Sequence, residues 1–313
     1  MEQSFHSAAQ LLLSHDNFLI VSHKNPDGDT LCSSAALCSV LRRAGKTAYL
    51  YPNPQITEKF RPYAVPFFAP EGFPAGYIVT VDVAAEDMFA KGFTGKADFC
   101  IDHHPTNPHF AADNLVCPEK SATGEIILAI AEEMTGHLTP EEADMLYIAV
   151  STDTGCFQYA NTNADTFRAV ARLTECGANN AALNVKFFRK VSKARLQLEG
   201  LIYSGMQFFR DGKIVISTVT LAMMAQCGAT EDDCDDLAAL PGRIEGEVVG
   251  VTIREREDGT SKISLRTTKD VSSIAICSAF GGGGHAMAAG CTIPAAPEKA
   301  AELLLAKINE VYK

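Results

Sequence analysis

The feature that most constrains the fold is an alternation of short apolar runs with longer amphipathic segments over roughly the first half of the chain. Runs of strand length occupy residues 17–23, 47–51, 76–84 and 98–104. Residues 30–45 and 123–136 have helical spacing and end in glycine. This alternation predicts an α/β domain with a mostly parallel sheet and helices on both faces.

The rest of the chain shows further helical patterns and a second group of strands. Helices are expected at residues 139–155, 163–177 and 184–205, then strands at 212–220, 247–255 and 261–268, and finally helices at 269–281 and 297–313. A length of 313 residues is more than one core usually fills. We therefore expect an N-terminal domain over residues 1–183, a helical connector over 184–205 and a smaller α+β domain over 206–313.

The balance of residue types excludes several classes of protein. Hydrophobic residues make up 47% and charged residues 21%, so the chain is neither disordered nor fibrous. No run of about 18 apolar residues and no signal-peptide pattern is found, which predicts a cytoplasmic protein with no membrane partner. The 10 cysteines include no C-x-x-C pair, which indicates reduced thiols.

The net charge of −11 argues against long nucleic acid as a partner, because such binding depends on Lys and Arg at phosphates. An anionic ligand must then be small or be met by metal ions. The connector carries a basic run: Lys186, Arg189, Lys190, Lys193 and Arg195. We interpret this run as a solvated helix face in preference to a phosphate-binding surface.

The loop "SHKNPDGDTLCSS" after the first predicted strand is the first candidate site. His23 stands at the strand end, and Asp27 and Asp29 flank Gly28 where the next helix begins. Such a turn can hold two carboxylates rigidly at a helix N-terminus. An ordinary P-D-G turn with an N-cap aspartate explains the tetrapeptide equally well, and the nearby histidine favours a metal site.

Polar residues also end three later apolar segments. Asp82 interrupts a buried run, the triplet Asp102, His103 and His104 ends another, and Asp153 follows a helical run. A helix cap is the commoner role for Asp153 taken alone, and a carboxylate in a buried strand is costly unless it is paired or bound to a cation. Elements ending at one sheet edge would together supply His23, Asp27, Asp29, Asp82, His103 and Asp153. This set suits two manganese-like ions about 3.5–4 Å apart with one shared carboxylate.

Five motifs in register carry a family resemblance. The segments "HKNPDGD", "VDVA", "IDHH" and "STDTG" resemble, in that order, the motifs of the DHH phosphoesterases. The segment "FGGGGHAMAAG" at 280–290 resembles the glycine-rich signature of the DHH-associated C-terminal domain. The chain is most similar to the branch of bifunctional oligoribonucleases (nano-RNases) and adenosine 3′,5′-bisphosphate phosphatases.

The resemblance implies a role for each residue of the predicted site. It implies a first metal held by His23, Asp27 and Asp82, and a second held by Asp29, Asp82, His103 and Asp153, with Asp82 bridging. Asp102 would orient a ligating imidazole, and His104 would act with Asp82 in catalysis by facing the phosphate. The implied cofactors are two Mn²⁺ ions, with Mg²⁺ or Co²⁺ as alternatives, which activate a water.

The C-terminal domain is expected to grip the substrate. The glycines Gly281, Gly282, Gly283 and Gly284 can present backbone N–H groups to an anion as a nest, with His285 as an added donor. Ser264 and Arg266 match the serine-flanked arginine of the family, which suits a terminal phosphate. A structural salt bridge is the alternative role for Arg266.

The resemblance implies a phosphoesterase with its active site in the cleft between the two domains. Its expected substrates are short oligoribonucleotides, cleaved to mononucleotides, and the 3′-phosphate of adenosine 3′,5′-bisphosphate. Cyclic or linear dinucleotides are the alternative, and a homodimer is compatible with this interpretation. A manganese inorganic pyrophosphatase would call for "PDTD" where Gly28 stands, and a non-catalytic nucleotide sensor would be expected to have lost metal ligands.

Overall fold

The computed structural model describes residues 3–234 and 236–313. Residues 1–2, with which the first predicted domain begins, and residue 235 lie outside the described residues. The chain divides into two compact units, Met1–Lys190 and Val191–Lys313. The three-part division expected from the sequence, and a site in a cleft between domains, stay predictions.

The first unit contains a five-stranded sheet in the order β2-β1-β3-β4-β5. Every neighbouring pair is parallel. The strands are β1 (Phe18–Val21), β2 (Ala48–Leu50), β3 (Tyr77–Val81), β4 (Phe99–Asp102) and β5 (Asp113–Val116). The predicted α/β domain with a parallel sheet is therefore confirmed.

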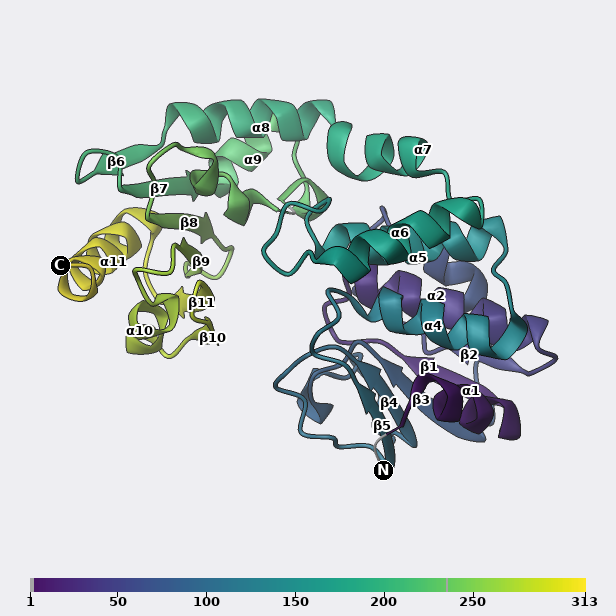
Figure 1. Ribbon diagram of the computed structural model, residues 1–313. Coiled ribbons are helices and arrows are strands. Elements are labelled where there is room, and N and C mark those ends of the chain that lie inside the picture. Colours follow the sequence, from purple (N-terminus) through teal and green to yellow (C-terminus); the bar gives the residue numbers. More distant parts are fainter. Residues whose placement is uncertain (1–2, 235) are drawn as a thin grey trace. The chain divides into compact units, whose positions relative to one another are not determined.

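Helices of the first unit pack on this sheet and on one another (Figure 1). They are α1 (Phe5–Ser14), α2 (Gly28–Arg43), α4 (Thr123–Thr135), α5 (Pro140–Asp153), α6 (Ala164–Glu175) and α7 (Asn180–Asn184). Short turns complete the unit: α3 (Arg61–Ala64), η1 (Val65–Phe67), η2 (Glu86–Met88) and the π-helix η3 (Val185–Arg189). Helix α2 contacts α4 and α5, and α6 lies on α5. The core beneath them includes Phe18, Ile20, Val79, Phe99 and Ile101.

The second unit contains a six-stranded mixed sheet in the order β10-β11-β9-β8-β7-β6. The strands are β6 (Gln207–Phe209), β7 (Ile214–Val219), β8 (Val249–Glu255), β9 (Ser261–Thr267), β10 (Gly283–His285) and β11 (Ala288–Ile293). Only β7 and β8 are parallel neighbours among these strands. The smaller α+β domain predicted for this part of the chain is confirmed.

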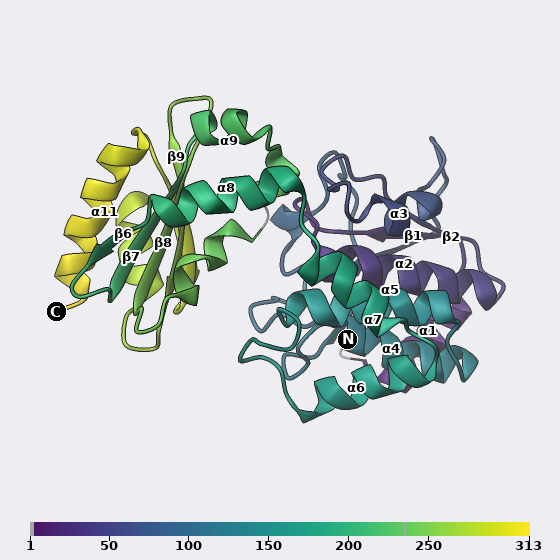
Figure 2. The same ribbon diagram turned by 90° about the horizontal axis from the view of Figure 1, so that it is seen from above.

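The two faces of this sheet carry different helices (Figure 2). On one face, residues such as Val251 and Leu265 form a core with α10 (Ser273–Cys277) and α11 (Pro297–Val311). On the other face, Val215 and Val219 pack with α8 (Lys193–Ser204) and α9 (Leu221–Cys227). The remaining turns are η4 (Glu231–Cys234), η5 (Leu237–Ala239), η6 (Pro241–Arg243) and η7 (Ser278–Phe280). Within the described ranges, no helix is long and apolar enough to span a bilayer.

Candidate active site

Acidic and imidazole side chains lie at the carboxyl ends of the central strands of the first unit. His23 follows β1, Asp82 follows β3, and His103 and His104 follow β4. The strand order reverses between β1 and β3, and open parallel sheets form their ligand sites at such a switch point. The fold therefore brings residues from distant parts of the sequence to one edge of the sheet.

The backbone of Asp82 is in an uncommon conformation. Its φ is 60°, in the left-handed region that residues other than glycine seldom adopt. Its N–H group donates a hydrogen bond of 2.9 Å to the carbonyl of Ile101 in β4, which holds the turn. Backbone strain of this kind gathers at functional sites. Here it directs a buried carboxylate into the cluster of histidines and acids.

The N-terminus of α2 carries two of the predicted ligands. Asp27 is the N-cap, and its side chain accepts a hydrogen bond from the first turn of the helix. Asp29, in the first turn of the helix, accepts a bond of 2.8 Å from the Ser33 hydroxyl. It also accepts bonds of 2.7 and 3.0 Å from the N–H groups of Thr123 and Gly124, which begin α4. The positive ends of two helices thus favour the ionised form of Asp29, against the larger effect of burial, which raises its pKa.

His23, Asp27 and Asp82 form one triad. The Nε2 atom of His23 lies 3.8 Å from Asp27 Oδ1 and 3.8 Å from Asp82 Oδ2. One ligand atom from each residue lies within 4.8 Å of the other two. Because metal–ligand distances are about 2.0–2.2 Å, atoms at this spacing can surround one cation. These are the residues predicted to hold the first metal.

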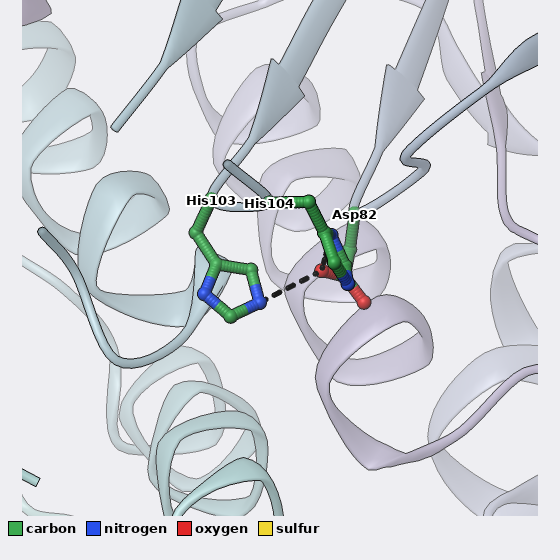
Figure 3. A group of neighbouring side chains, drawn as sticks. All are labelled: Asp82, His103 and His104. Atoms are coloured by element: carbon green, nitrogen blue, oxygen red, sulfur yellow. Dashed lines mark ion pairs between the residues drawn. The ribbon is translucent and has the colours of Figure 1, made fainter. Parts of the chain in front are cut away.

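Asp29, His103 and Asp153 form a second triad with the same spacing. The Nε2 atom of His103 lies 3.6 Å from Asp153 Oδ2 and 3.5 Å from Asp82 Oδ1, and Figure 3 shows this imidazole pointing at Asp82. The opposite ring nitrogen, Nδ1, lies 3.1 Å from the carbonyl oxygen of Lys120. A proton on Nδ1 in this bond leaves the lone pair of Nε2 free for a metal.

Electrostatics in this cluster favour a bound cation. Burial raises the pKa of Asp82 well above its usual value, and the charges of Asp29 and Asp27 raise it further. Burial and the same two charges raise the pKa of Asp153 to about 8. Divalent cations would offset the repulsion among these carboxylates. A donor set of carboxylates and imidazoles suits Mn²⁺ or a similar ion. The residues present therefore fit two metal ions.

His104 is held by Asp102. The Nδ1 atom of His104 lies 2.7 Å from Oδ1 of Asp102, a fully buried residue. Burial acts to lower the pKa of His104, but the hydrogen bond to Asp102 and the charges of nearby carboxylates, Asp102 first among them, together outweigh it and raise that pKa. Nδ1 also lies 3.7 Å from Asp82 and within a third triad of Asp82, His103 and His104. Because Asp102 occupies Nδ1, the Nε2 atom is the one left to face a substrate.

Three supporting residues were not predicted from the sequence. Asn107 donates a bond of 2.6 Å to Asp102 Oδ2. Thr123 bonds the carboxylates of Asp29 and Asp82, and Lys120 bonds His103 only through its backbone carbonyl. Asn107 follows the D-H-H triplet by three residues, and this short separation could have indicated that it supports Asp102. A threonine in the first turn of a helix is ordinary, so its sequence position gave no signal.

The predicted substrate residues of the second unit lie in two rows across its sheet. Arg266 in β9 is opposite Ala288 in β11, which is opposite His285 in β10. Ser264, Gly290 and Gly283 form the next row in the same way. Side chains in a row point to the same face of a sheet. Since neighbouring residues of β9 face α10 and α11, Ser264 and Arg266 face away from these helices.

The glycine run differs from the predicted nest of free N–H groups. The N–H groups of Gly281 and Gly282 bond to the carbonyls of Ser278 and Cys277, at 3.1 and 3.0 Å. Gly283 and Gly284 belong to β10, which pairs with β11. A Cβ at Gly282 would lie 2.2 Å from the carbonyl oxygen of Gly290. Close approach of two backbones therefore requires glycine here, and a substrate contact of Gly281 to Gly284 stays a prediction.

Comparison with known protein families agrees with this geometry. Residues 17–150 match the model of the DHH family, N-terminal domain, and residues 211–313 match the DHHA1 domain. The chain belongs to the DHH family. The resemblance read from the sequence motifs is thereby confirmed, and this DHH protein is a phosphoesterase hydrolase of a metal-dependent family.

Individual relatives are similar over nearly the whole DHH chain. A "Bifunctional oligoribonuclease and PAP phosphatase NrnA" of Thermus thermophilus is 34% identical, over 88% of this chain and 83% of the relative. A protein with the same name from Bacillus subtilis is 24% identical, over 96% of both chains. The solved structure of an exopolyphosphatase-related protein from Bacteroides fragilis has a TM-score of 0.88 at 22% identity, covering 98% of this chain and 96% of that one. This last likeness shows the fold alone.

Proposed function

We propose that this DHH phosphoesterase uses two Mn²⁺ ions to hydrolyse short oligoribonucleotides to mononucleotides, to remove the 3′-phosphate of adenosine 3′,5′-bisphosphate, or both. The names of the relatives in Thermus thermophilus and Bacillus subtilis support this choice of substrates. The net charge of −11 supports it as well, because short ligands need few basic contacts.

One observation carries the proposal: Asp82, a member of the first triad, also lies close to His103 of the second. Its Oδ2 atom is 3.8 Å from His23 Nε2, and its Oδ1 atom is 3.5 Å from His103 Nε2. A carboxylate in this position can bridge two cations. Two such ions, when bound, lower the pKa of a water and neutralise charge on a phosphoryl group.

Residues of the chain supply the remaining parts of the reaction. Asp29 accepts hydrogen bonds from three donors, and Asp27 accepts one from the N–H group of Thr30. These two fixed carboxylates would hold the ions on the α2 side. His104 presents Nε2 to the phosphate, and Asp102 favours its protonated form. A protonated imidazole stabilises charge on the equatorial oxygens and can donate a proton to the leaving oxygen.

The second unit supplies substrate selection in this proposal. Arg266 is exposed on the face of its sheet opposite α10 and α11, and His285 lies in the same row two strands away. An exposed guanidinium and an imidazole in one row suit a phosphate remote from the reacting one. Ser264, one row along, adds a hydroxyl.

A substrate panel tests the proposal. We expect Mn²⁺-dependent release of mononucleotides from di- to pentaribonucleotides, phosphate release from adenosine 3′,5′-bisphosphate, or both. Pyrophosphate and cyclic dinucleotides serve as competing substrates. Faster turnover of either competitor, with no activity on the proposed substrates, would replace this assignment with the corresponding one, and binding without any turnover would indicate a nucleotide sensor.

A further inference from the structure

Two lysines of the first unit make cation–π contacts with the same aromatic ring. The Nζ atoms of Lys59 and Lys186 lie 5.2 and 5.3 Å from the ring centre of Phe187. Lys59 also lies over Phe60, and Lys186 lies over Tyr63, whose hydroxyl accepts a hydrogen bond of 3.0 Å from its Nζ atom. We call Lys59, Phe60, Tyr63, Lys186 and Phe187 the lysine–aromatic cluster.

The aromatic part of the lysine–aromatic cluster is a packed support. Phe60 and Phe187 are both buried and stack with ring centres 5.6 Å apart and planes at 19°. Phe187 lies in the π-helix Val185–Arg189, a rare element that often marks functional positions. The two ammonium groups therefore pack on aromatic rings whose positions are fixed by burial and stacking.

The two ammonium groups of the cluster form no ion pair with the described residues. Among the residues that the structure describes, no carboxylate lies within ion-pair distance of Lys59 or Lys186, and the neighbouring Glu58 pairs with Arg61 at 3.3 Å. Two like charges sharing one ring repel each other, and in a chain of net charge −11 acidic partners are plentiful. Two neighbouring lysines without carboxylate partners among the described residues are suited to binding an anion from solution.

Two hydrogen bonds connect the elements that carry the cluster to the elements that carry the candidate active site. Asn184, just before the π-helix, accepts a hydrogen bond of 3.0 Å from Tyr147 in α5, the helix that ends at Asp153. The loop before Phe60 is tied to the loop of His23, because Asn53 donates a bond of 2.9 Å to the carbonyl of His23.

The charge of Lys186 also reaches the first turns of α2. Burial raises the pKa of the Cys32 thiol in α2, the charges of Asp29 and Asp27 add to this, and the charge of Lys186 opposes it. Lys186 and the two aspartates therefore act on the same point in the first turns of α2.

This arrangement departs from the solvated helix face expected for the basic run. Arg195 belongs to that run but is buried in the second unit and donates a hydrogen bond of 2.6 Å to Glu199. Lys186 lies in the first unit on the lysine–aromatic cluster instead. Arg195 therefore forms a structural ion pair, whereas Lys186 belongs to an exposed cationic surface.

We propose that Lys59 and Lys186 bind a backbone phosphate of an oligonucleotide substrate, one or more nucleotides away from the phosphate that is hydrolysed. The nature of the ligand rests on the proposed function. Lysine binds phosphate as a point charge, and single-stranded nucleic acid sites combine such charges with aromatic rings. The site would give the enzyme a preference for oligonucleotides over substrates with a single phosphate.

Binding measured without catalysis tests this inference. A fluorescent tetraribonucleotide with phosphorothioate linkages is titrated in EDTA against the full chain and against Lys186→Gln and Lys59→Gln. Each substitution is expected to weaken binding by about 5- to 30-fold, the range for one charged hydrogen bond at a partly exposed site. Loss of one phosphate contact should also reduce the slope of log Kd against log salt by about 0.7.

Lys96→Gln is the matched control, because this exposed lysine precedes β4 at the edge of the sheet opposite His103. It should bind with the affinity and salt slope of the unaltered chain. Unchanged affinity and slope in both test variants, or no binding by the unaltered chain, would overturn the inference. Hydrolysis of the unmodified tetramer with Mn²⁺ is measured in parallel. Weakened binding in the variants with no hydrolysis by the unaltered chain would overturn the oligoribonuclease part of the proposed function and leave this site standing.

Discussion

Thr123 bonds to Asp82 across the candidate active site: its hydroxyl donates a hydrogen bond of 2.9 Å to Asp82 Oδ1. The N–H group of the same residue donates a bond of 2.7 Å to Asp29 Oδ2. One residue at the start of α4 thus fixes a carboxylate from each triad. A fixed carboxylate loses less entropy when a metal binds, so we expect Thr123 to contribute to metal affinity without being a ligand.

Thr123→Val tests this contribution, since valine keeps the shape and the N–H group but lacks the hydroxyl. We expect the affinity for Mn²⁺ to fall by about 10-fold, the lower end of the range for lost supporting hydrogen bonds. Isothermal titration with Mn²⁺ measures the change. Thr94→Val, at an exposed position of the same unit, is the control. Equal affinity in both variants would show that the hydroxyl of Thr123 has no part in metal binding.

His104→Ala separates a role at the phosphate from a role at the metal. The variant should keep its manganese content while turnover falls by about 10²–10⁴-fold, the range for a lost acid or charge-stabilising donor. Metal analysis and steady-state kinetics give the two quantities. His109→Asn changes an exposed histidine of the same loop and should alter neither. A manganese ion lost from His104→Ala would make His104 a ligand.

The stability of the metal-free protein should fall as pH rises from about 5 to about 8. Burial raises the pKa of Asp82, Asp29 and Asp153, the last to about 8, so the folded chain holds more protons than the unfolded chain over this interval. The free energy of unfolding therefore decreases with pH. The raised pKa of His104 acts in the same direction, because its contribution is lost as pH rises through the folded value.

Thermal unfolding in EDTA and in Mn²⁺ across this pH range checks the sign. Manganese should raise the melting temperature more at about pH 8 than at about pH 6, because it competes with protons for the carboxylates. Asp153→Asn should flatten the decline seen in EDTA. A metal-free protein whose stability rises steadily over the range would contradict the charge arrangement described for the site.

Arg266→Ala tests the assignment of the second unit to substrate selection. The ratio kcat/KM for a phosphate-bearing dinucleotide should fall by about 10- to 150-fold, the equivalent of one charged hydrogen bond. Hydrolysis of bis-p-nitrophenyl phosphate, which has no second phosphate, should change little. Arg256→Ala, an exposed arginine in the turn after β8, is the control. Equal losses on both substrates, with fold and metals intact, would place Arg266 at the reacting phosphate.

Much of the site could be predicted because strand ends of a parallel sheet converge. Once β1, β3 and β4 were read as parallel strands, His23, Asp82 and His103 had to lie at one edge, whatever the details of the loops. Short apolar runs with polar ends carry this information directly. The division of the ligands into a set of three and a set of four, with Asp82 in both, came from the family resemblance. The spacing of the two triads is compatible with this division.

Other features depend on contacts that a linear pattern does not contain. Strand β5 begins with Asp113 and Asn114, residues unfavourable in strands, and forms because β4 offers a free edge. The left-handed backbone of Asp82 occurs where the chain leaves β3, next to the hydrogen bond from its N–H group to Ile101 in β4. Gly283 and Gly284 were expected to belong to an anion-binding nest, yet they form a strand that pairs with β11, which four glycines without side-chain alternation do not indicate.

The metal content of Asp82→Ala, measured together with activity, tests the central claim most directly. Asp87→Ala removes the same charge from an exposed position five residues later and serves as the control. We predict that the unaltered chain and Asp87→Ala each bind two Mn²⁺ ions and hydrolyse phosphoesters, whereas Asp82→Ala binds both ions weakly and is inactive. Two ions bound to Asp82→Ala with the affinity of the unaltered chain would contradict a two-metal site built around this carboxylate.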